Sequence, residues 1–189
     1  MTIADTQAVL ALYPLGGATF SADRRYRYRL WRHWSCGPVL LVIGVNPSTA
    51  DETRNDATIR RCIGYAKRWG YAGLEMRNLF ALRATDPHEM MAADDPMGDN
   101  YRPLLFAVAA TVEGDGAVLA AWGVHGAHRD ADATFGLDLR RNWPESGVAC
   151  LGYTKGRCPR HPLYMRSDAV PVAYLGDGGR LVTSRQVTA

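Results

Sequence analysis

The sequence shows few of the features that mark membrane or secreted proteins. Although 47% of its 189 residues are hydrophobic, no apolar run approaches the roughly 18 residues that a membrane-spanning helix needs. Residues 1–7 carry no basic segment, so a secretory signal peptide is not indicated. We therefore expect a cytoplasmic protein with no membrane partner, and its length fits one domain with a substantial core.

Cysteine is scarce, and its spacing excludes the usual cysteine sites. The sequence has four cysteines, and no two of them form a Cys-x-x-Cys pair. This argues against disulfides and against a zinc site, and favours reduced, mostly buried thiols. We accordingly predict neither a metal nor a cofactor. The four are Cys36, Cys62, Cys150 and Cys158.

The net charge of +3 is too small to indicate a nucleic-acid partner, but the basic residues are clustered. Five arginines between residues 24 and 32 alternate with Tyr26, Tyr28 and Leu30, which predicts a strand with one basic and one apolar face. A solvated sheet face is the simpler explanation of that pattern. The second cluster lies among glycines and prolines, and such a loop suits a phosphate or another anion. It consists of Lys155, Arg157, Arg160 and Arg166.

Short apolar runs alternate with helical patterns along most of the chain. This alternation predicts an α/β fold, a three-layer α/β/α sandwich with a mostly parallel central sheet. We expect one domain over residues 1–189, with a core from about 20 to 175 and a flexible tail at 176–189. A short helix at 1–15 and a basic strand or hairpin at about 24–34 begin the chain. The further strands are expected at 39–45, 73–82, 117–122 and 147–151, and the helices at 56–69, 99–112 and 128–142.

The most informative segment is Leu40-Leu-Val-Ile-Gly-Val-Asn-Pro-Ser-Thr-Ala-Asp51, in which a buried run stops at a special loop. Gly44 permits a close backbone approach, Pro47 fixes its own φ, and Asn46 is left at the carboxyl end of the strand. Three other predicted strands also end in polar or special residues. Because the carboxyl ends of parallel strands share the edge where α/β sheets bind ligands, we expect these residues to line one crevice. They are Asn78, Trp122, Gly123 and the 152–165 loop with His161.

Each of these residues also has an ordinary structural explanation. The pair Asn46-Pro47 is typical of a plain turn, Asn78 can cap a turn, and Trp122 can belong to the core. His161 can be a surface histidine. The prediction of a site therefore depends on the convergence of four strand ends and not on any single residue.

The order of these motifs resembles that of the uracil-DNA glycosylase superfamily. Gly44-Val-Asn-Pro-Ser48 resembles its first motif in the mismatch-specific Gly-Ile-Asn-Pro form, and residues 77–83 resemble the strand whose Asn reads the base edge. Residues 117–123 resemble its Leu-Leu-Trp-Gly strand, and His161-Pro-Leu163 resembles a shortened His-Pro-Ser-Pro-Leu motif. From about 20 to 175 the chain looks even more like a bacterial and phage domain-of-unknown-function family with the patterns Gly-Val-Asn-Pro-Ser-Thr-Ala-Asp and Thr-Lys-x-Gly-x-Pro-x-His-Pro-Leu-Tyr.

The glycosylase resemblance implies hydrolysis of an N-glycosidic bond, which needs a water at C1′ and a stabiliser for the departing base anion. It implies catalytic roles for Asn46, Asp51 and His161, with Asn46 orienting the water and His161 donating to a developing negative oxygen. Asn78 would read a pyrimidine edge. The residues implied to bind the base or ligand are Gly44, Pro47, Ser48, Asn78, Trp122 and Gly123, and those implied to bind phosphate are Lys155, Arg157 and Arg160.

The chain departs from the resemblance in ways that bear on mechanism. The acid of the strongest uracil glycosylases is absent from the first motif, where Ser48 follows Pro47. Asp51 and Asp56 are acids nearby that can replace it, bind a metal or cap the following helix, and capping is the expectation for Asp56. The cysteine spacing does not resemble that of the members with iron–sulfur clusters.

Three functions are consistent with this pattern. The first is an enzyme acting on a damaged or modified base in DNA, the second an enzyme acting on a small nucleotide, and the third a non-catalytic module that binds nucleic acid or nucleotides. We expect a monomer whose partner is DNA or a nucleotide. A wide basic face built from Arg25, Arg27 and Arg29 beside the crevice would favour DNA, and an enclosed pocket would favour a small molecule.

Overall fold

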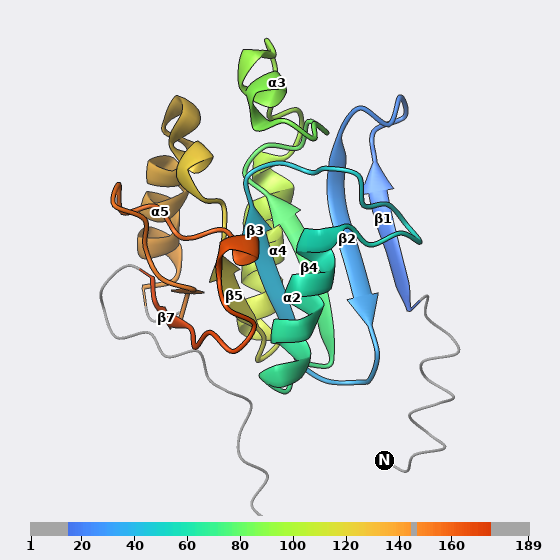
Figure 1. Ribbon diagram of the computed structural model, residues 1–189, viewed down its shortest axis with the longest axis vertical. Coiled ribbons are helices and arrows are strands. Elements are labelled where there is room, and N and C mark those ends of the chain that lie inside the picture. Colours follow the sequence, from blue (N-terminus) through green and yellow to red (C-terminus); the bar gives the residue numbers. More distant parts are fainter. Residues whose placement is uncertain (1–14, 145–146, 175–189) are drawn as a thin grey trace, which may run out of the picture.

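A mixed β-sheet forms the centre of the computed structural model, which describes residues 15–144 and 147–174 (Figure 1). Within these residues the sheet has seven strands in the order β1-β2-β4-β3-β5-β6-β7. The four central strands run parallel, and β1, β2 and β7 pair antiparallel at the two sides. The strands are β1 Gly16–Phe20, β2 Arg27–His33, β3 Val39–Gly44, β4 Gly73–Asn78, β5 Ala117–Ala120, β6 Ala149–Cys150 and β7 Val172–Ala173.

The four strands that the sequence predicts as parallel do lie parallel in one sheet, as β3, β4, β5 and β6. The expectation of a mostly parallel sheet is nevertheless wrong, because three of the six strand pairings are antiparallel. The connection between β1 and β2, residues 21–26, is far too short for the crossover that parallel neighbours need. The fold is therefore α/β with a mixed sheet.

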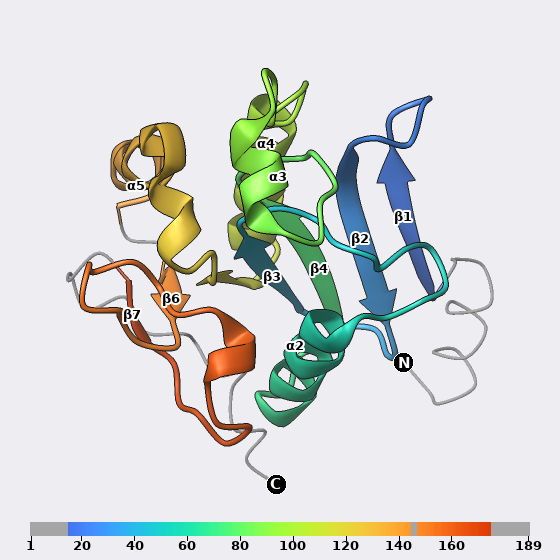
Figure 2. The same ribbon diagram turned by 45° about the horizontal axis from the view of Figure 1, so that its top comes forward.

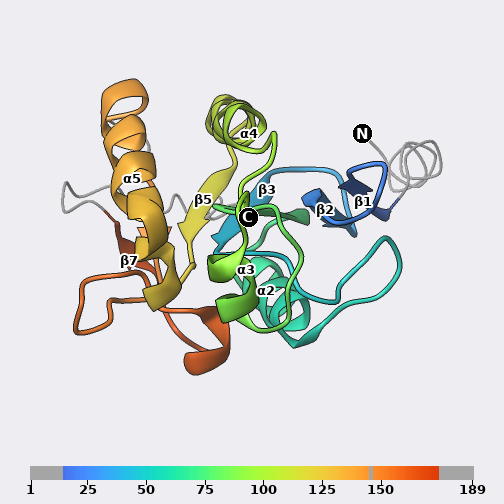
Figure 3. The ribbon, with the colours of Figure 1, turned by 90° about the horizontal axis from the view of Figure 1, so that it is seen from above.

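Helices cover both faces of this sheet, with α2 on one face and α4 and α5 on the other (Figure 3). The strand β3 is buried on both sides, so Leu40 and Val42 pack towards α2 while Leu41 and Ile43 pack in the other cluster. The alternation follows from the two-residue repeat of a strand. The helices are α2 Ala57–Arg68, α3 Pro87–Ala92, α4 Tyr101–Glu113 and α5 Ala131–Asn142, with 3-10 turns η1 Val124–Asp130 and η2 Pro162–Tyr164.

The helix α2 begins at the carboxyl edge of the sheet, and its start is fixed by Asp56. The Asp56 carboxylate accepts a hydrogen bond of 2.8 Å from the backbone N–H of Ile59, which is a helix N-cap. The predicted helix at 56–69 and the predicted capping role of Asp56 are both confirmed. The chain leaves β3 at this same edge, and the short turn η2 lies beside α2 (Figure 2).

The strand β2 contains a bulge that separates two of its arginines. Thr19 pairs with Arg29, but the next residue, Phe20, pairs with Arg27, so Tyr28 is an extra residue. Such a bulge interrupts the alternation of faces. Arg27 therefore reaches the α2 side, where its Nη1 donates to the Ala50 carbonyl at 2.7 Å, while Arg29 pairs with Glu75 at 2.7 Å.

Three elements were not expected from the sequence: β1, α3 and β7. The predicted strand at 73–82 ends earlier, at Asn78, and the predicted helix at 128–142 begins at Ala131, after η1. The helix expected at 1–15 falls almost wholly outside the described residues, and the tail expected at 176–189 lies outside them entirely. Over the described ranges, no helix has the length and apolarity to cross a membrane.

Candidate functional site

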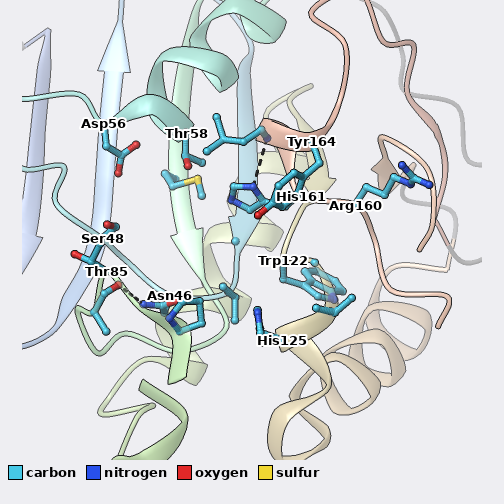
Figure 4. A pocket seen from close by; sticks show the side chains of 18 of the residues that line it. Asn46, Ser48, Asp56, Thr58, Thr85, Trp122, His125, Arg160, His161 and Tyr164 are labelled. Carbon is cyan, nitrogen blue, oxygen red and sulfur yellow. Dashed lines mark hydrogen bonds between the residues drawn. The ribbon is translucent and has the colours of Figure 1, made fainter. Parts of the chain in front are cut away.

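A crevice of about 650 Å³ opens at the carboxyl edge of the parallel strands. Its walls come from the ends of β3 and β5, the first turn of α2, and the loop that joins β6 to η2 (Figure 4). The structure thus brings together residues that lie far apart in the sequence. Of the residues predicted from the sequence as catalytic or binding residues, those lining the crevice are Gly44, Asn46, Ser48, Trp122, Gly123, Lys155, Arg160 and His161.

The Asn46 amide is held in one orientation by the main chain. Its Nδ2 donates to the carbonyl oxygens of Pro47 at 3.0 Å and of Ala84 at 2.8 Å. Because carbonyls only accept, the amide nitrogen must face them and Oδ1 must face away. No hydrogen bond from a described residue engages Oδ1. Asn46 therefore offers the crevice a fixed acceptor.

The His161 imidazole presents a hydrogen-bond donor. Its Nδ1 accepts a hydrogen bond of 3.4 Å from the backbone N–H of Leu163, so in the neutral ring the proton is on Nε2. Burial lowers the pKa of His161 below its usual value, and the carboxylate of Asp56 opposes that effect. The ring is therefore neutral at neutral pH and donates through Nε2.

Asp56 is the carboxylate that the structure places in the crevice. Its charge acts on two other lining residues, His161 and Arg27, whose pKa values it raises against the larger lowering effect of burial. One of its oxygens, Oδ1, caps α2. Asp56 therefore caps α2 and also influences the pKa values of two other crevice residues, His161 and Arg27.

The residues at the end of β5 fix the opposite wall. Gly123 has a φ of +69° and a ψ of −163°, a conformation that only glycine adopts without strain. Its N–H donates to the Pro159 carbonyl at 2.9 Å, which ties the basic loop to the sheet. Trp122 is 1% exposed and packs edge-on against Phe135 and Tyr174. Trp122 is thus a core residue whose edge reaches the crevice.

Asn78 was expected in the crevice but lies behind its wall. The side chain is 3% exposed and packs against Gly44, where an added Cβ would come within 3.2 Å of the Asn78 Oδ1. In the described part of the chain, Oδ1 has no hydrogen-bond partner. Gly44 and Met76, which adjoin this side chain on β3 and β4, line the crevice, and Asn78 does not. The Asn78 amide is therefore separated from the open crevice by Gly44 and Met76.

Three further residues expected at the site do not line the crevice: Pro47, Asp51 and Arg157. The Asp51 carboxylate instead accepts from the backbone N–H groups of Arg54 at 2.7 Å and Thr53 at 2.9 Å. These bonds lower the pKa of Asp51 and hold the loop before α2. Pro47 contributes its carbonyl to Asn46, and Arg157 stands at a tight turn with a φ of +62°.

The loop between β6 and η2 brings Lys155 and Arg160 to the crevice, and it is closed by its own main chain. Thr154 N–H donates to the Cys158 carbonyl at 2.9 Å, and Arg160 N–H donates to the Gly152 carbonyl at 2.9 Å. The Arg160 side chain also donates through Nε to the Tyr153 carbonyl at 2.9 Å. The main chain of this loop and the side chain of Arg160 therefore have defined positions beside the opening.

The first basic cluster does not form a continuous basic face. Arg27 is 4% exposed and lines the crevice, whereas Arg29 pairs with Glu75 and lies over the Trp31 ring at 4.6 Å. Arg32 donates to Asn55 and to the Asp51 carbonyl. Only Arg25 of the three arginines considered for a DNA-binding face is exposed and outside an ion pair.

Several lining residues were not recognised as site residues from the sequence. Arg27 was missed because the bulge that redirects it has no sequence signal, whereas Asp56 was named as an acid near the site, with helix capping as its expected role. No group of three His, Cys, Asp or Glu side chains in the described residues has the arrangement of a metal site. The other missed residues include Thr58, Met76, Thr85, His125 and Tyr164.

Comparison with known proteins gives a family but no activity. A family model described as "Protein of unknown function (DUF1643)" matches residues 27–163, which is more than half of the chain and includes every crevice residue discussed above except Tyr164. No curated protein and no solved structure matches the chain.

Proposed function

Since the chain belongs to the DUF1643 family, whose description names no substrate, we propose from the crevice itself that the protein hydrolyses the N-glycosidic bond of a nucleotide. The proposed chemistry is that of the uracil-DNA glycosylase superfamily, whose motif order the sequence resembles, and we infer the three-layer fold of that superfamily as well. The observation that carries the proposal is the set Asn46, Asp56 and His161 around one crevice of nucleotide size.

The two acceptors suit the attacking water. Asn46 Oδ1 is held in place by the bonds of Nδ2, and the Asp56 carboxylate lines the same crevice. A water held between such acceptors has its oxygen directed at C1′ as its O–C1′ bond forms and the C1′–N bond breaks. The carboxylate accepts the proton that the water loses. Asp56 thereby replaces Asp51 as the candidate for the acid that the first motif lacks.

The donor suits the leaving group. As the C1′–N bond breaks, the electron pair of that bond passes to the base, negative charge develops on its exocyclic carbonyl oxygens, and the Nε2–H of His161 is available to stabilise it. The lowered pKa of His161 keeps the imidazole neutral, so the proton remains on Nε2 while the base departs and is then protonated from solvent. In this proposal Lys155 and Arg160, which line the crevice, bind a phosphate of the same nucleotide.

The arrangement of charge favours a single nucleotide, free or turned out of a strand, over a wide duplex footprint. The expected face of Arg25, Arg27 and Arg29 is divided, because Arg27 is buried in the crevice and Arg29 is paired with Glu75. A small free nucleotide is therefore the favoured alternative to a base in DNA as the substrate.

The test is release of free base from oligonucleotides and mononucleotides that carry a panel of damaged and hypermodified bases, measured by mass spectrometry. We expect release from at least one substrate, its loss in Asp56→Asn and His161→Ala, and its retention in Asp51→Asn. Because Asn caps a helix as well as Asp does, Asp56→Asn removes the charge without removing the cap. Binding of nucleotides without base release from any of them would make the protein a binding module, and equal effects of the two Asp→Asn changes would refute the role of Asp56.

A further inference from the structure

The guanidinium of Arg27 is the most deeply buried charge along the crevice. The residue is 4% exposed and nevertheless lines the opening, together with Asn46, Ser48 and Asp56. Burial lowers the pKa of Arg27 to about 10, against the raising effect of Asp56. A buried cation is costly unless charged or polar partners surround it. The buried guanidinium of Arg27 therefore needs a charged or polar partner.

The described residues provide Arg27 with few of the polar or charged partners that a buried cation needs. Its side chain makes one hydrogen bond, from Nη1 to the Ala50 carbonyl at 2.7 Å, and no ion pair of the described residues includes it. Asp56, the acid with the largest effect on Arg27, is outside ion-pair distance, and its Oδ1 is occupied by the N–H of Ile59. The other guanidinium nitrogens stay available for a bidentate contact with a planar oxyanion.

The position of Arg27 is also built by a special feature of the backbone. The extra residue Tyr28 in β2 brings Arg27 to the α2 side, away from the Arg29–Glu75 pair. Bulges of this kind are common beside functional sites because they redirect a side chain. The first turn of α2, with Thr58 and Ile59, lines the crevice as well, so the positive end of the helix dipole adds to the attraction for an anion.

Arg27 and the basic loop approach the crevice from different parts of the sheet. Arg27 comes from β2, on one side of the central strands, and Lys155 and Arg160 come from the loop after β6, on the other. In Figure 4, Asn46, Ser48 and Asp56 lie on one side of the opening and Tyr164 and Arg160 on the other, with His161 between them. A ligand that fills the crevice thus meets a cation at each end.

We propose that Arg27 binds an acidic group carried by the nucleobase, so that the substrate class is a nucleotide whose base bears a carboxylate on the ring edge remote from the sugar. This rests on the proposed function, in which Lys155 and Arg160 hold the nucleotide phosphate and the base lies between Asn46 and His161. With the phosphate at the basic loop, the far edge of the base faces Arg27. The carboxylate then supplies the anion that the described residues lack.

The experiment compares ligands that differ by one group at a time. Calorimetry measures the affinity of the full chain for 2′-deoxyuridine, its 5′-monophosphate, and the 5-carboxy derivative of each. We expect the carboxylate to strengthen binding by about tenfold or more, as a charge-assisted pair in a buried site does. In Arg27→Gln this preference falls to within about twofold, and Arg27→Lys, with a single point charge, retains part of it. The exposed neighbour Arg25, changed to Gln, is the control and leaves the preference intact.

Two further comparisons make the assignment specific. Lys155→Gln should reduce the gain from the phosphate but leave the gain from the carboxylate. If Arg27→Gln instead removes the gain from the phosphate, the ligand lies the other way round and the proposal is wrong. It is also wrong if the wild-type protein does not distinguish the carboxylated ligand, binds none of the four, or if Arg27→Gln weakens all four equally, as a purely structural role for the bond to Ala50 would require.

Circular dichroism and thermal unfolding of each variant show whether it is folded. If Arg27→Gln is not folded, Arg27→Lys serves as the test variant in its place. The outcome is separable from that of the proposed function. Release of free base without a preference for the carboxylated ligand would overturn this inference alone. A preference that depends on Arg27, without base release from any substrate, would overturn the proposed hydrolysis alone.

Discussion

The carboxylate of Asp56 acts on the imidazole of His161 inside the crevice. Burial of the ring lowers the pKa of His161, and the negative charge of Asp56 raises it again in part. The two residues come from different segments, the cap of α2 and the turn before η2, so their relation exists only in the folded chain. This relation bears on the protonation state of His161. Among the described histidines, His161 is the one whose Nδ1 is fixed by a backbone N–H.

Asp56→Asn should lower the pKa of His161 further, because it removes the charge that opposes burial. The change is measured from the pH dependence of the His161 ring resonances by NMR. Asn is an equally good N-cap, so the helix start should be preserved. Asp51→Asn serves as the matched control and should leave the titration of His161 in place. A rise of the His161 pKa in Asp56→Asn would contradict the relation.

Base release should decline as the pH falls through the pKa of His161 in the folded protein, which burial holds below the ordinary value of about 6.5. Protonated His161 carries a hydrogen on Nδ1 and loses the bond from the Leu163 N–H, so the turn that positions the ring is disturbed. The same shift makes folding less favourable in acid. With a folded pKa below 6.5, the unfolded chain binds the extra proton first, and stability falls as the pH drops from 6.5 to the folded pKa. His161→Gln should reduce that slope in chemical denaturation, while the slope due to His33, whose pKa burial also lowers, remains.

Asn46→Asp should destabilise the fold by about 1–3 kcal/mol, because an ionised carboxylate cannot donate to the Pro47 and Ala84 carbonyls. Placing an acid at position 46 therefore does not recreate a strong base at this site. The free energy of unfolding from urea titrations and the rate of base release check the two parts. Full stability in Asn46→Asp, or faster base release, would show that these two bonds do not matter.

Gly123→Ala should lower stability by about 1–3 kcal/mol, since the φ of +69° and ψ of −163° suit glycine alone. An added Cβ would lie 3.5 Å from the Cβ of His161, which is an ordinary van der Waals contact, so the His161 ring should keep its position. Thermal unfolding measures the loss of stability, and the NMR spectrum of His161 checks the position of the ring. Gly156→Ala, at a glycine with no positive φ and open space around it, is the comparison variant.

Lys155→Ala should weaken nucleotide binding for every base alike and lower the slope of log affinity against log salt by about one, because a phosphate contact carries no base information. Arg157→Ala, which lies outside the crevice lining, should change either quantity less. Calorimetric titrations at several salt concentrations measure both. An Arg157→Ala effect as large as that of Lys155→Ala would restore the phosphate role that the sequence suggested for Arg157.

The sequence predicts the parallel centre of the fold well, because buried strands such as Val39–Gly44 leave long apolar runs. It does not predict β1 or β7, since Gly16-Gly-Ala-Thr-Phe20 has no clear alternation and β7 has only two residues. The carboxyl ends of parallel strands share one edge of a sheet, and Asn46, Trp122 and His161 accordingly line one crevice at that edge. The sequence pattern does not predict the direction of each side chain.

Asn78, Asp51 and Arg27 illustrate that limit. Asn78 stands at a strand end but is buried and does not line the crevice, and Asp51 accepts hydrogen bonds from backbone N–H groups of its own loop. Arg27 appears in the sequence as one of several alternating arginines, and only the tertiary structure shows that a bulge separates it from Arg29. Side-chain placement depends on contacts between distant segments, which a local pattern does not contain.

The main-chain bonds within residues 152–160 have a consequence for how fast and how tightly a ligand binds. Because Gly123 N–H, Thr154 N–H and Arg160 N–H already close this loop, the main chain that carries Lys155 and Arg160 does not have to be ordered when the ligand arrives. The entropy of fixing this main chain is lost during folding, and the complex forms without that part of the cost. Association should then follow simple second-order kinetics, with no slow step for rearrangement of the loop.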